Sequence, residues 1–144
     1  MNASYVKENA AQRRRLSALT MGRPEAELGR DVGNGWSVAA KLVHLAFWDR
    51  YCLALIQQWE RTGVTSSPAE VDAINEAVRV LSAAIPLAAT AELARAAAEA
   101  VDQKVEQITN ELAAAIESAG RVRVLRRSEH RREHLDQIER ALAG

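Results

Sequence analysis

Hydrophobic residues recur along the chain at the three- and four-residue spacing of amphipathic α-helices. The pattern predicts a first helix over residues 4–20, a glycine-rich connection over 21–35 with one helical turn at 25–28, and a second helix over 37–61. Ser37 is expected to cap the second helix and Gly63 to end it. The apolar positions of this helix cover more than one side, which indicates burial on several faces.

Three further helices are predicted in the second half of the chain. The segment 67–70 has a capping-box pattern with proline at the first helical position, so a short helix is expected from there to Pro86. An apolar stripe that begins at Leu93 predicts one long helix from about residue 87 or 91 to Glu117. A last helix is expected over residues 124–141.

Four main helices, with a shorter one between the second and the third, predict an all-α protein with an up-down-up-down four-helix bundle. Short connections favour antiparallel neighbours in this arrangement. The abundance of alanine and the aromatic content of only 4% also favour helix over sheet. A chain of 144 residues has the size of one domain, so residues 1–144 are expected to form a single domain.

Composition argues against several classes of function. Basic and acidic residues balance at 19 each, so no overall charge points to nucleic acid or to a membrane surface. Residues 1–4 lead into a charged segment without the apolar core of a secretion signal, and no apolar run approaches the ~20 residues that span a bilayer. The single cysteine, Cys52, excludes an internal disulfide framework, fits a reducing cytoplasm and is expected to be buried among apolar residues.

The three histidines of the chain predict one metal site. His130 and His134 are four residues apart, so on a helix both imidazoles lie on one face, about 40° apart around the axis. His44 lies on a mostly apolar face of the second helix. In an antiparallel bundle the start of one helix faces a late part of another, which would bring His44 to the pair. Three imidazoles with open positions are typical of a catalytic metal centre.

Simpler interpretations remain open for each element of this site. His44 alone fits a core histidine bonded to the backbone, and the pair fits two exposed histidines in a polar helix. The nearby arginines form either an electropositive rim for an acidic substrate or a solvated face paired with acidic neighbours, and we expect the latter. These arginines are Arg126, Arg127, Arg131 and Arg132.

Other candidate residues receive no catalytic role from the sequence. Asp49 lies about 140° around the helix from His44, and Glu133 lies off the face of the histidine pair. The general base therefore stays unassigned. Aromatic residues near the site are expected to pack and not to hold substrate, namely Trp36, Trp48, Tyr51 and Trp59.

Three stretches of the sequence form a recognisable set: residues 35–38 (Gly-Trp-Ser-Val), 44–49 (His-Leu-Ala-Phe-Trp-Asp) and 130–138 (His-Arg-Arg-Glu-His-Leu-Asp-Gln-Ile). Together they resemble the DinB/YfiT-like superfamily, which includes the N-terminal domains of mycothiol-dependent maleylpyruvate isomerases. The resemblance covers essentially the whole chain in length and helix order. It implies a four-helix bundle, often dimeric, with one divalent metal on His44, His130 and His134. The sequence given stops at Gly144, without the isomerases' additional C-terminal domain, so isomerisation itself is not expected.

The resemblance further implies a cytoplasmic, homodimeric enzyme acting on a small molecule, with zinc, nickel, iron or manganese as the ion. A low-molecular-weight thiol such as mycothiol or bacillithiol is the implied cosubstrate. A metal of this kind can hold a thiolate for S-transfer, which is our first expectation, or activate water for hydrolysis, which is the second. The competing hypothesis is a non-enzymatic, dimerising helical interaction module, and neither nucleic acid nor a membrane is an expected partner.

Overall fold

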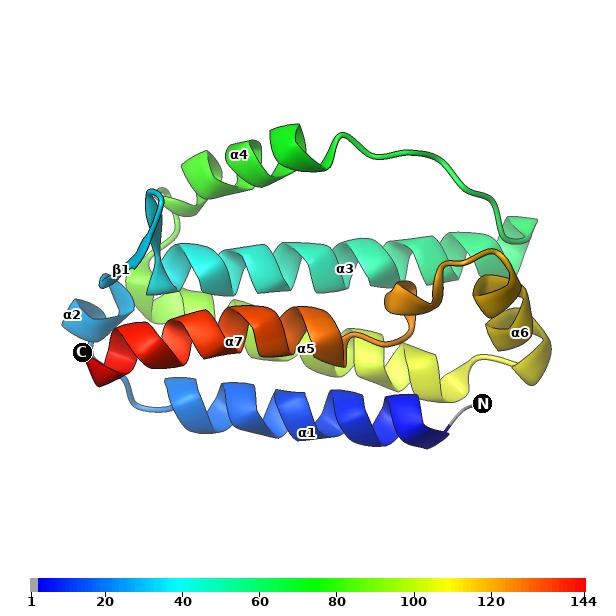
Figure 1. Cartoon of the computed structure of the whole chain (residues 1–144), viewed down its shortest axis with the longest axis horizontal. Coiled ribbons are helices and arrows are strands. Elements are labelled where there is room, and N and C mark those ends of the chain that lie inside the picture. Colours follow the sequence, from blue (N-terminus) through cyan, green and yellow to red (C-terminus); the bar gives the residue numbers. More distant parts are fainter. Residues whose placement is uncertain (1–2) are drawn as a thin grey trace.

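The computed structural model describes residues 3–144, which are helical over most of their length (Figure 1). The α-helices of this part are α1 (Ala3–Thr20), α2 (Glu25–Leu28), α3 (Val38–Thr62), α4 (Val71–Ser82), α5 (Leu87–Gln107), α6 (Asn110–Ser118) and α7 (Ser128–Ala143). A small antiparallel sheet of β1 (Asp31–Gly33) and β2 (Trp36–Ser37) and a 3-10 turn (Val122–Val124) complete the regular structure. The predicted all-α class is confirmed.

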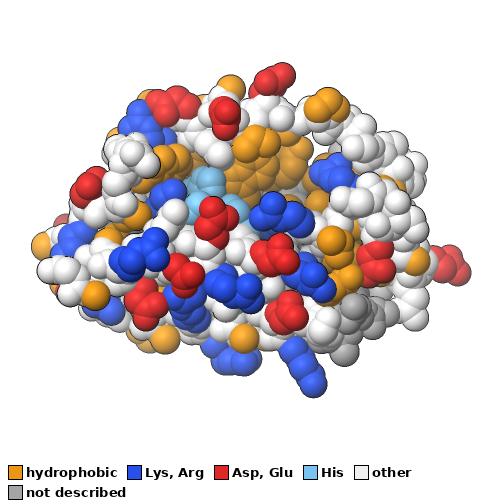
Figure 2. All heavy atoms as spheres, in the orientation of Figure 1, with side chains coloured by type: hydrophobic (Ala, Val, Ile, Leu, Met, Phe, Trp, Pro, Cys, Tyr) orange, Lys and Arg blue, Asp and Glu red, His pale blue; other side chains and the backbone are white. Residues whose placement is uncertain are grey.

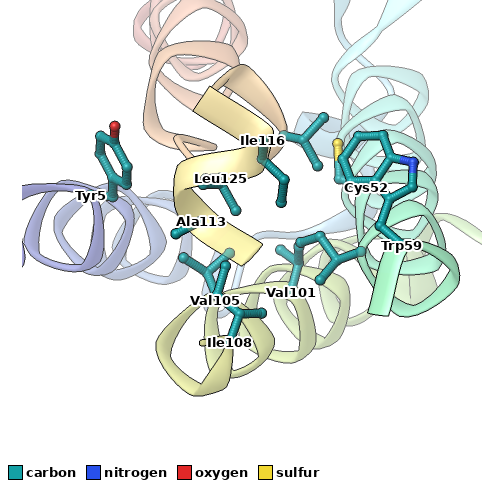
Figure 3. Packing of buried hydrophobic residues seen from close by; sticks show 11 residues of the cluster. Tyr5, Cys52, Trp59, Val101, Val105, Ile108, Ala113, Ile116 and Leu125 are labelled. Atoms are coloured by element: carbon teal, nitrogen blue, oxygen red, sulfur yellow. The ribbon is translucent and has the colours of Figure 1, made fainter. Parts of the chain in front are cut away.

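Buried side chains form two clusters along the long helices. The first cluster joins α3, α5 and α6 and is drawn in Figure 3; it consists of Tyr5, Cys52, Ile56, Trp59, Val101, Val105, Ile108, Ala113, Ile116, Val124 and Leu125. The second cluster consists of Leu16, Leu28, Val38, Leu42, Leu45, Ala91, Ala94, Ala98, Leu135, Ile138 and Leu142. The C-terminal halves of α3 and α5 thus meet in the first cluster, and their N-terminal halves meet in the second.

The clusters show that α3 and α5 run in the same direction, so the predicted up-down-up-down order is wrong. Tyr5 of α1 lies in the first cluster and Leu16 in the second, which makes α1 antiparallel to α3. α7 is antiparallel to α3 as well (Figure 1). The reason lies in residues 63–70 and α4, which lead the chain back along α3 before α5 begins. The prediction treated this stretch as a short insertion, whereas it is a full return crossing.

The long helix predicted to reach Glu117 is interrupted and forms α5 and α6. Ile108 is extended (φ −68°, ψ 155°), and the hydroxyl of Thr109 accepts a hydrogen bond from the amide of Leu112 at 3.0 Å. Because Thr109 caps a new helix in this way, the segment forms two helices where the apolar stripe predicted one. The predicted first member of that stripe, Leu93, is also 43% exposed, so the apolar stripe is not buried in the core at its start.

The last helix begins at Ser128, four residues later than predicted. Asn9 of α1 explains the shift, because its buried side chain bonds to both ends of the preceding bend. Its amide nitrogen donates to the carbonyl of Leu125 at 2.9 Å, and its amide oxygen accepts from the backbone N–H of Ser128 at 2.9 Å. Asn9 therefore satisfies the free N–H at the start of α7 in place of a cap from the helix's own sequence.

The connection over residues 21–35 contains the predicted turn, α2, and a hairpin that we did not predict. Asn34 and its two flanking glycines have positive φ values, 113° at Gly33, 55° at Asn34 and 82° at Gly35, and such residues suit a tight hairpin. The hairpin places Trp36 immediately before α3. Ser37 then caps α3 as predicted, accepting a hydrogen bond from the amide of Ala40 at 3.0 Å.

The predicted capping box at residues 67–70 does not form. α4 begins at Val71, its N-terminal side has no side-chain cap, and it ends at Ser82, before Pro86. The capping-box residues belong to an irregular stretch that runs back along part of α3 before α4 begins (Figure 1). Among the described residues, no helix has both the length and the apolar character needed to cross a bilayer. Met1 and Asn2, part of the stretch used to judge a secretion signal, lie outside these residues.

Candidate metal centre

The three histidines meet in space, as predicted. His44 lies in the first third of α3, and His130 and His134 project from the first half of α7. Each offers a ring nitrogen, and these three atoms lie within 4.8 Å of one another. The Nε2 atoms of His44 and His130 are 3.1 Å apart. Two nitrogen ligands at about 2.0–2.1 Å from one zinc ion would be roughly 3.0–3.4 Å apart, which the pair of His44 and His130 matches, and the set of three is compatible with a metal site.

Burial keeps the three imidazoles neutral at neutral pH. It is the largest cause that lowers the pKa of His44 from 6.5 to about 3, and electrostatic interactions with His134, Lys41 and Arg127 lower it further. Burial likewise lowers the pKa of His130, aided by Arg127. The pKa of His134 is lowered by burial against an opposing hydrogen bond with Gln137. Neutral imidazoles have free lone pairs, which is the form that binds metal.

These shifts predict acid destabilisation that starts near pH 6.5. Unfolded histidines take up protons below pH 6.5, whereas folded His44 stays neutral down to about pH 3, so folding loses stability as pH falls through this window. Each such histidine contributes a slope of about 1.4 kcal/mol per pH unit. Urea unfolding of metal-free protein between pH 7.5 and 5 should show a slope smaller by about this amount in His44→Asn. An equal slope in both proteins would show that folded His44 is protonated.

Each member of the pair on α7 has a hydrogen-bond partner behind it. The Nδ1–H of His134 donates to Oε1 of Gln137 at 2.9 Å, which leaves Nε2 free as a ligand. Nδ1 of His130 accepts from Nη2 of Arg127 at 3.1 Å, since an arginine has only donors. The remaining proton of His130 is then on Nε2 and is donated to Nε2 of His44, and it would have to leave this atom before Nε2 could bind a metal. Nδ1 of His44 is buried and has no protein partner among the described residues.

Gln137 is expected to strengthen metal binding through His134. Gln137→Leu keeps the approximate shape but removes the acceptor, and we expect the metal dissociation constant to rise about 10–100-fold. Gln137→Glu keeps an acceptor at the same position and should bind at least as tightly as the wild type. A competition titration against a chromophoric chelator measures both. If Gln137→Leu binds like the wild type, the hydrogen bond does not orient His134.

A buried network of charges lies directly behind the histidines. Arg127 donates from Nε to Oδ1 of Asp49 at 2.8 Å. Arg131, with no exposed surface, donates to Oδ2 of Asp49 at 3.1 Å and to Oδ1 and Oδ2 of Asp102 at 2.8 and 2.9 Å. Burial would lower the pKa of Arg131, but the two carboxylates reverse this and raise it. The network ties α3, α5 and α7 together and fixes Arg127 against His130.

A solvent-accessible cavity of about 490 Å³ opens over the histidines. Figure 2 shows histidine atoms in a hollow beside hydrophobic side chains, with charged groups around it. Besides the three histidines, the cavity is lined by Trp36, Lys41, Trp48, Val71, Asn75, Arg123, Arg127 and Glu133. Trp36 and Trp48 contact His44 edge-on, with ring centroids 5.4 and 6.5 Å from its own. The site thus combines a nitrogen donor set, aromatic walls and a mixed set of charges.

The structure corrects several expectations about residues near the site. Arg127 and Arg131 are buried and paired, so they do not belong to the expected solvated face. Arg126 is half-buried and pairs with Glu8 and Glu129, and Arg132 is exposed. Trp36 and Trp48 line the cavity, in contrast to the expected role in packing alone, whereas Trp59 is a core residue.

Two other expectations fare differently. Tyr51 lines a neighbouring cavity and not the one over the histidines. Cys52 is buried in the first cluster as predicted, and burial raises the pKa of its thiol. A thiol in this state is not a reactive nucleophile.

Several residues that support the site are not predicted from the sequence. Gln137 follows His134 by three residues, which is contact spacing on a helix and was a usable signal. Lys41 precedes His44 by three residues, and its Nζ lies 4.6 Å from the ring centroid of Trp36. Asp49 has no predicted catalytic role because it faces away from His44, and the same direction lets it bind Arg127.

In the comparisons with known proteins, no family model, curated protein or solved structure matches this chain.

Proposed function

We propose that the three histidines bind one divalent transition metal, and that the protein is a metal-dependent enzyme of the DinB-like type. The observation that supports this most strongly is the set of three neutral ring nitrogens within 4.8 Å at the base of a cavity. Three protein ligands leave coordination positions for water or substrate, as in catalytic centres. The positions of the histidines, one early in α3 and two in α7, also agree with the sequence pattern on which the resemblance to that superfamily rests.

Thiol S-transfer to a small electrophile is the reaction that we propose. The metal would supply Lewis acidity that lowers the pKa of a bound thiol. The thiol proton leaves to solvent, the sulfur forms a bond to the electrophilic carbon, and the leaving group departs with its electron pair. Lys41 and Arg123 line the cavity and attract an anionic thiol or electrophile. Trp36 and Trp48 shield the reacting atoms from water. A cytoplasmic homodimer is part of the same proposal.

Hydrolysis by metal-bound water is the second candidate. Glu133 supports it, because this carboxylate lines the same cavity as the three histidines. A carboxylate in that position can take the proton of an attacking water. The two reactions differ in their requirement for a thiol, which makes them separable in one assay.

Elemental analysis of protein purified without an affinity tag is the first test, with about one equivalent of metal expected. The loaded protein is then assayed with 1-chloro-2,4-dinitrobenzene and cysteine, and separately with p-nitrophenyl acetate without thiol. Thiol-dependent release of chloride that a chelator abolishes supports S-transfer. Metal-dependent ester cleavage without thiol supports the hydrolase. No metal, and no uptake on titration with zinc, nickel, iron(II) or manganese, would overturn both.

A further inference from the structure

A second cavity lies against the one that contains the histidines. It has a volume of about 210 Å³. Its lining consists of the apolar and aromatic residues Trp48, Tyr51, Cys52, Leu55 and Val124, together with Gly120, Arg121, Arg123 and Arg127. An apolar protein cavity of about 150 Å³ holds a benzene molecule, so this one has room for an aromatic ring or a short alkyl chain. Its lining comes from the middle of α3 and from the segment that precedes α7.

The two cavities are separated by single side chains. Trp48, Arg123 and Arg127 line both of them. Arg127 also contacts the site directly, with its Nη2 3.1 Å from Nδ1 of His130. Trp48 is held in place, since its indole N–H donates to the side-chain oxygen of Asn75 at 2.7 Å. A molecule bound at the histidines therefore needs to pass only this narrow boundary to reach the second cavity.

The charges at this boundary do not oppose an apolar guest. Arg127 is neutralised by Asp49, 2.8 Å from its Nε. The side chain of Arg123 is 67% exposed, and its contact with Glu129 is long, at 3.8 Å, so it can turn into solvent at little cost. Burial raises the pKa of the Cys52 thiol and keeps this side chain neutral. Arg121 also lines the cavity, but its guanidinium lies over the ring of Trp59, 5.4 Å from the centroid, so the walls of the second cavity present mainly carbon and sulfur to whatever enters.

We infer that the second cavity is a subsite for the apolar group, a phenyl ring or a short alkyl chain, of a ligand whose polar end lies at the histidines. This inference rests on the proposed function for the polar end and adds the chemical class of the other end. It selects amphipathic small molecules over small polar ones. Each methylene group buried in such a subsite strengthens binding about fourfold.

The test compares ligands with the same metal-binding end. Zinc-loaded protein is titrated calorimetrically with acetohydroxamate and with 4-phenylbutanohydroxamate, and the second should bind at least ~10-fold more tightly. Leu55→Trp fills the second cavity and should reduce this advantage to less than about twofold, with acetohydroxamate unaffected. Leu93→Trp adds the same side chain on the exposed face of α5, outside both cavities, and should behave like the wild type.

A metal-independent arm separates failure of the subsite from failure of the metal site. Metal-free protein is titrated with 4-phenylbutan-1-ol, and the indole N–H resonance of Trp48 is followed by NMR. A shift in the wild type that Leu55→Trp abolishes supports the subsite even if no hydroxamate binds. The inference is overturned if the hydroxamates bind and the phenyl group brings no gain in affinity, or if that gain persists in Leu55→Trp. It is also overturned if the alcohol leaves the Trp48 resonance unchanged.

Discussion

Replacing Arg131 with methionine should lower the free energy of unfolding by about 3–5 kcal/mol, the range measured when one member of a buried ion pair is removed. The guanidinium has no exposed surface and bonds to Asp49, Asp102 and the backbone carbonyls of Asn9 and Ala98. Methionine retains much of the volume but leaves both carboxylates short of a donor. Among the described residues, Asp49 then keeps only Arg127 and Asp102 keeps only Arg13, so the desolvation of the two carboxylates is compensated less fully, and this cost dominates the loss.

Urea unfolding followed by circular dichroism measures this effect, and Arg132→Met is the matched control. Arg132 is the next residue of α7 and is exposed, so its replacement should change the free energy of unfolding by less than about 0.5 kcal/mol. Asp102→Asn, which keeps the shape and one acceptor, should have an intermediate effect and remain measurable if Arg131→Met does not fold. Equal stability of Arg131→Met and Arg132→Met would show that the network does not hold the helices together.

The contrast between Arg131 and Arg132 shows why the sequence predicted the site only in part. Both arginines occur in one polar stretch, and neither composition nor spacing separates a buried cation from a solvated one. The difference depends on Asp49 and Asp102, which come from two other helices. Asp102 is one of four acids in α5 and is not conspicuous there, but Asp49 lies among apolar residues of α3, and an acid in such a place needs a partner. That signal was present in the sequence, but the identity of the partner was not.

The meeting of the three histidines was predictable because it follows from one rule about helix spacing and one assumption about helix direction. The spacing of His130 and His134 fixes their common face on a helix. The meeting with His44 requires only that α7 be antiparallel to α3, and this holds although the order of the helices was wrong. The error concerned α5, which contributes no ligand. The break at Thr109 and the late start of α7 depend on side-chain hydrogen bonds, one of them from Asn9 of α1. The spacing of hydrophobic residues does not predict such bonds.

Substituting alanine for any one of the three histidines should raise the dissociation constant of the metal more than about 100-fold. Removing a hydrogen-bonded supporting residue costs about 10–100-fold, and loss of a ligand costs more because a coordinate bond disappears. The three variants should behave alike, since each contributes one nitrogen to the same cluster. Cobalt(II) serves as the spectroscopic probe, because its visible absorption reports both stoichiometry and geometry. Wild type should bind one equivalent, and the variants should lose the spectrum at equal concentrations.

Arg132→Ala provides the control on the same helix, outside the cavity, and should retain the wild-type spectrum. A difference among the three variants would also be informative. If His44→Ala retains tight binding while His130→Ala and His134→Ala do not, the ion is held by the pair on α7 alone, and the contact of 3.1 Å between His44 and His130 is a hydrogen bond within a buried pair. Such a result would contradict the three-histidine centre and with it the open catalytic coordination on which the proposed chemistry depends.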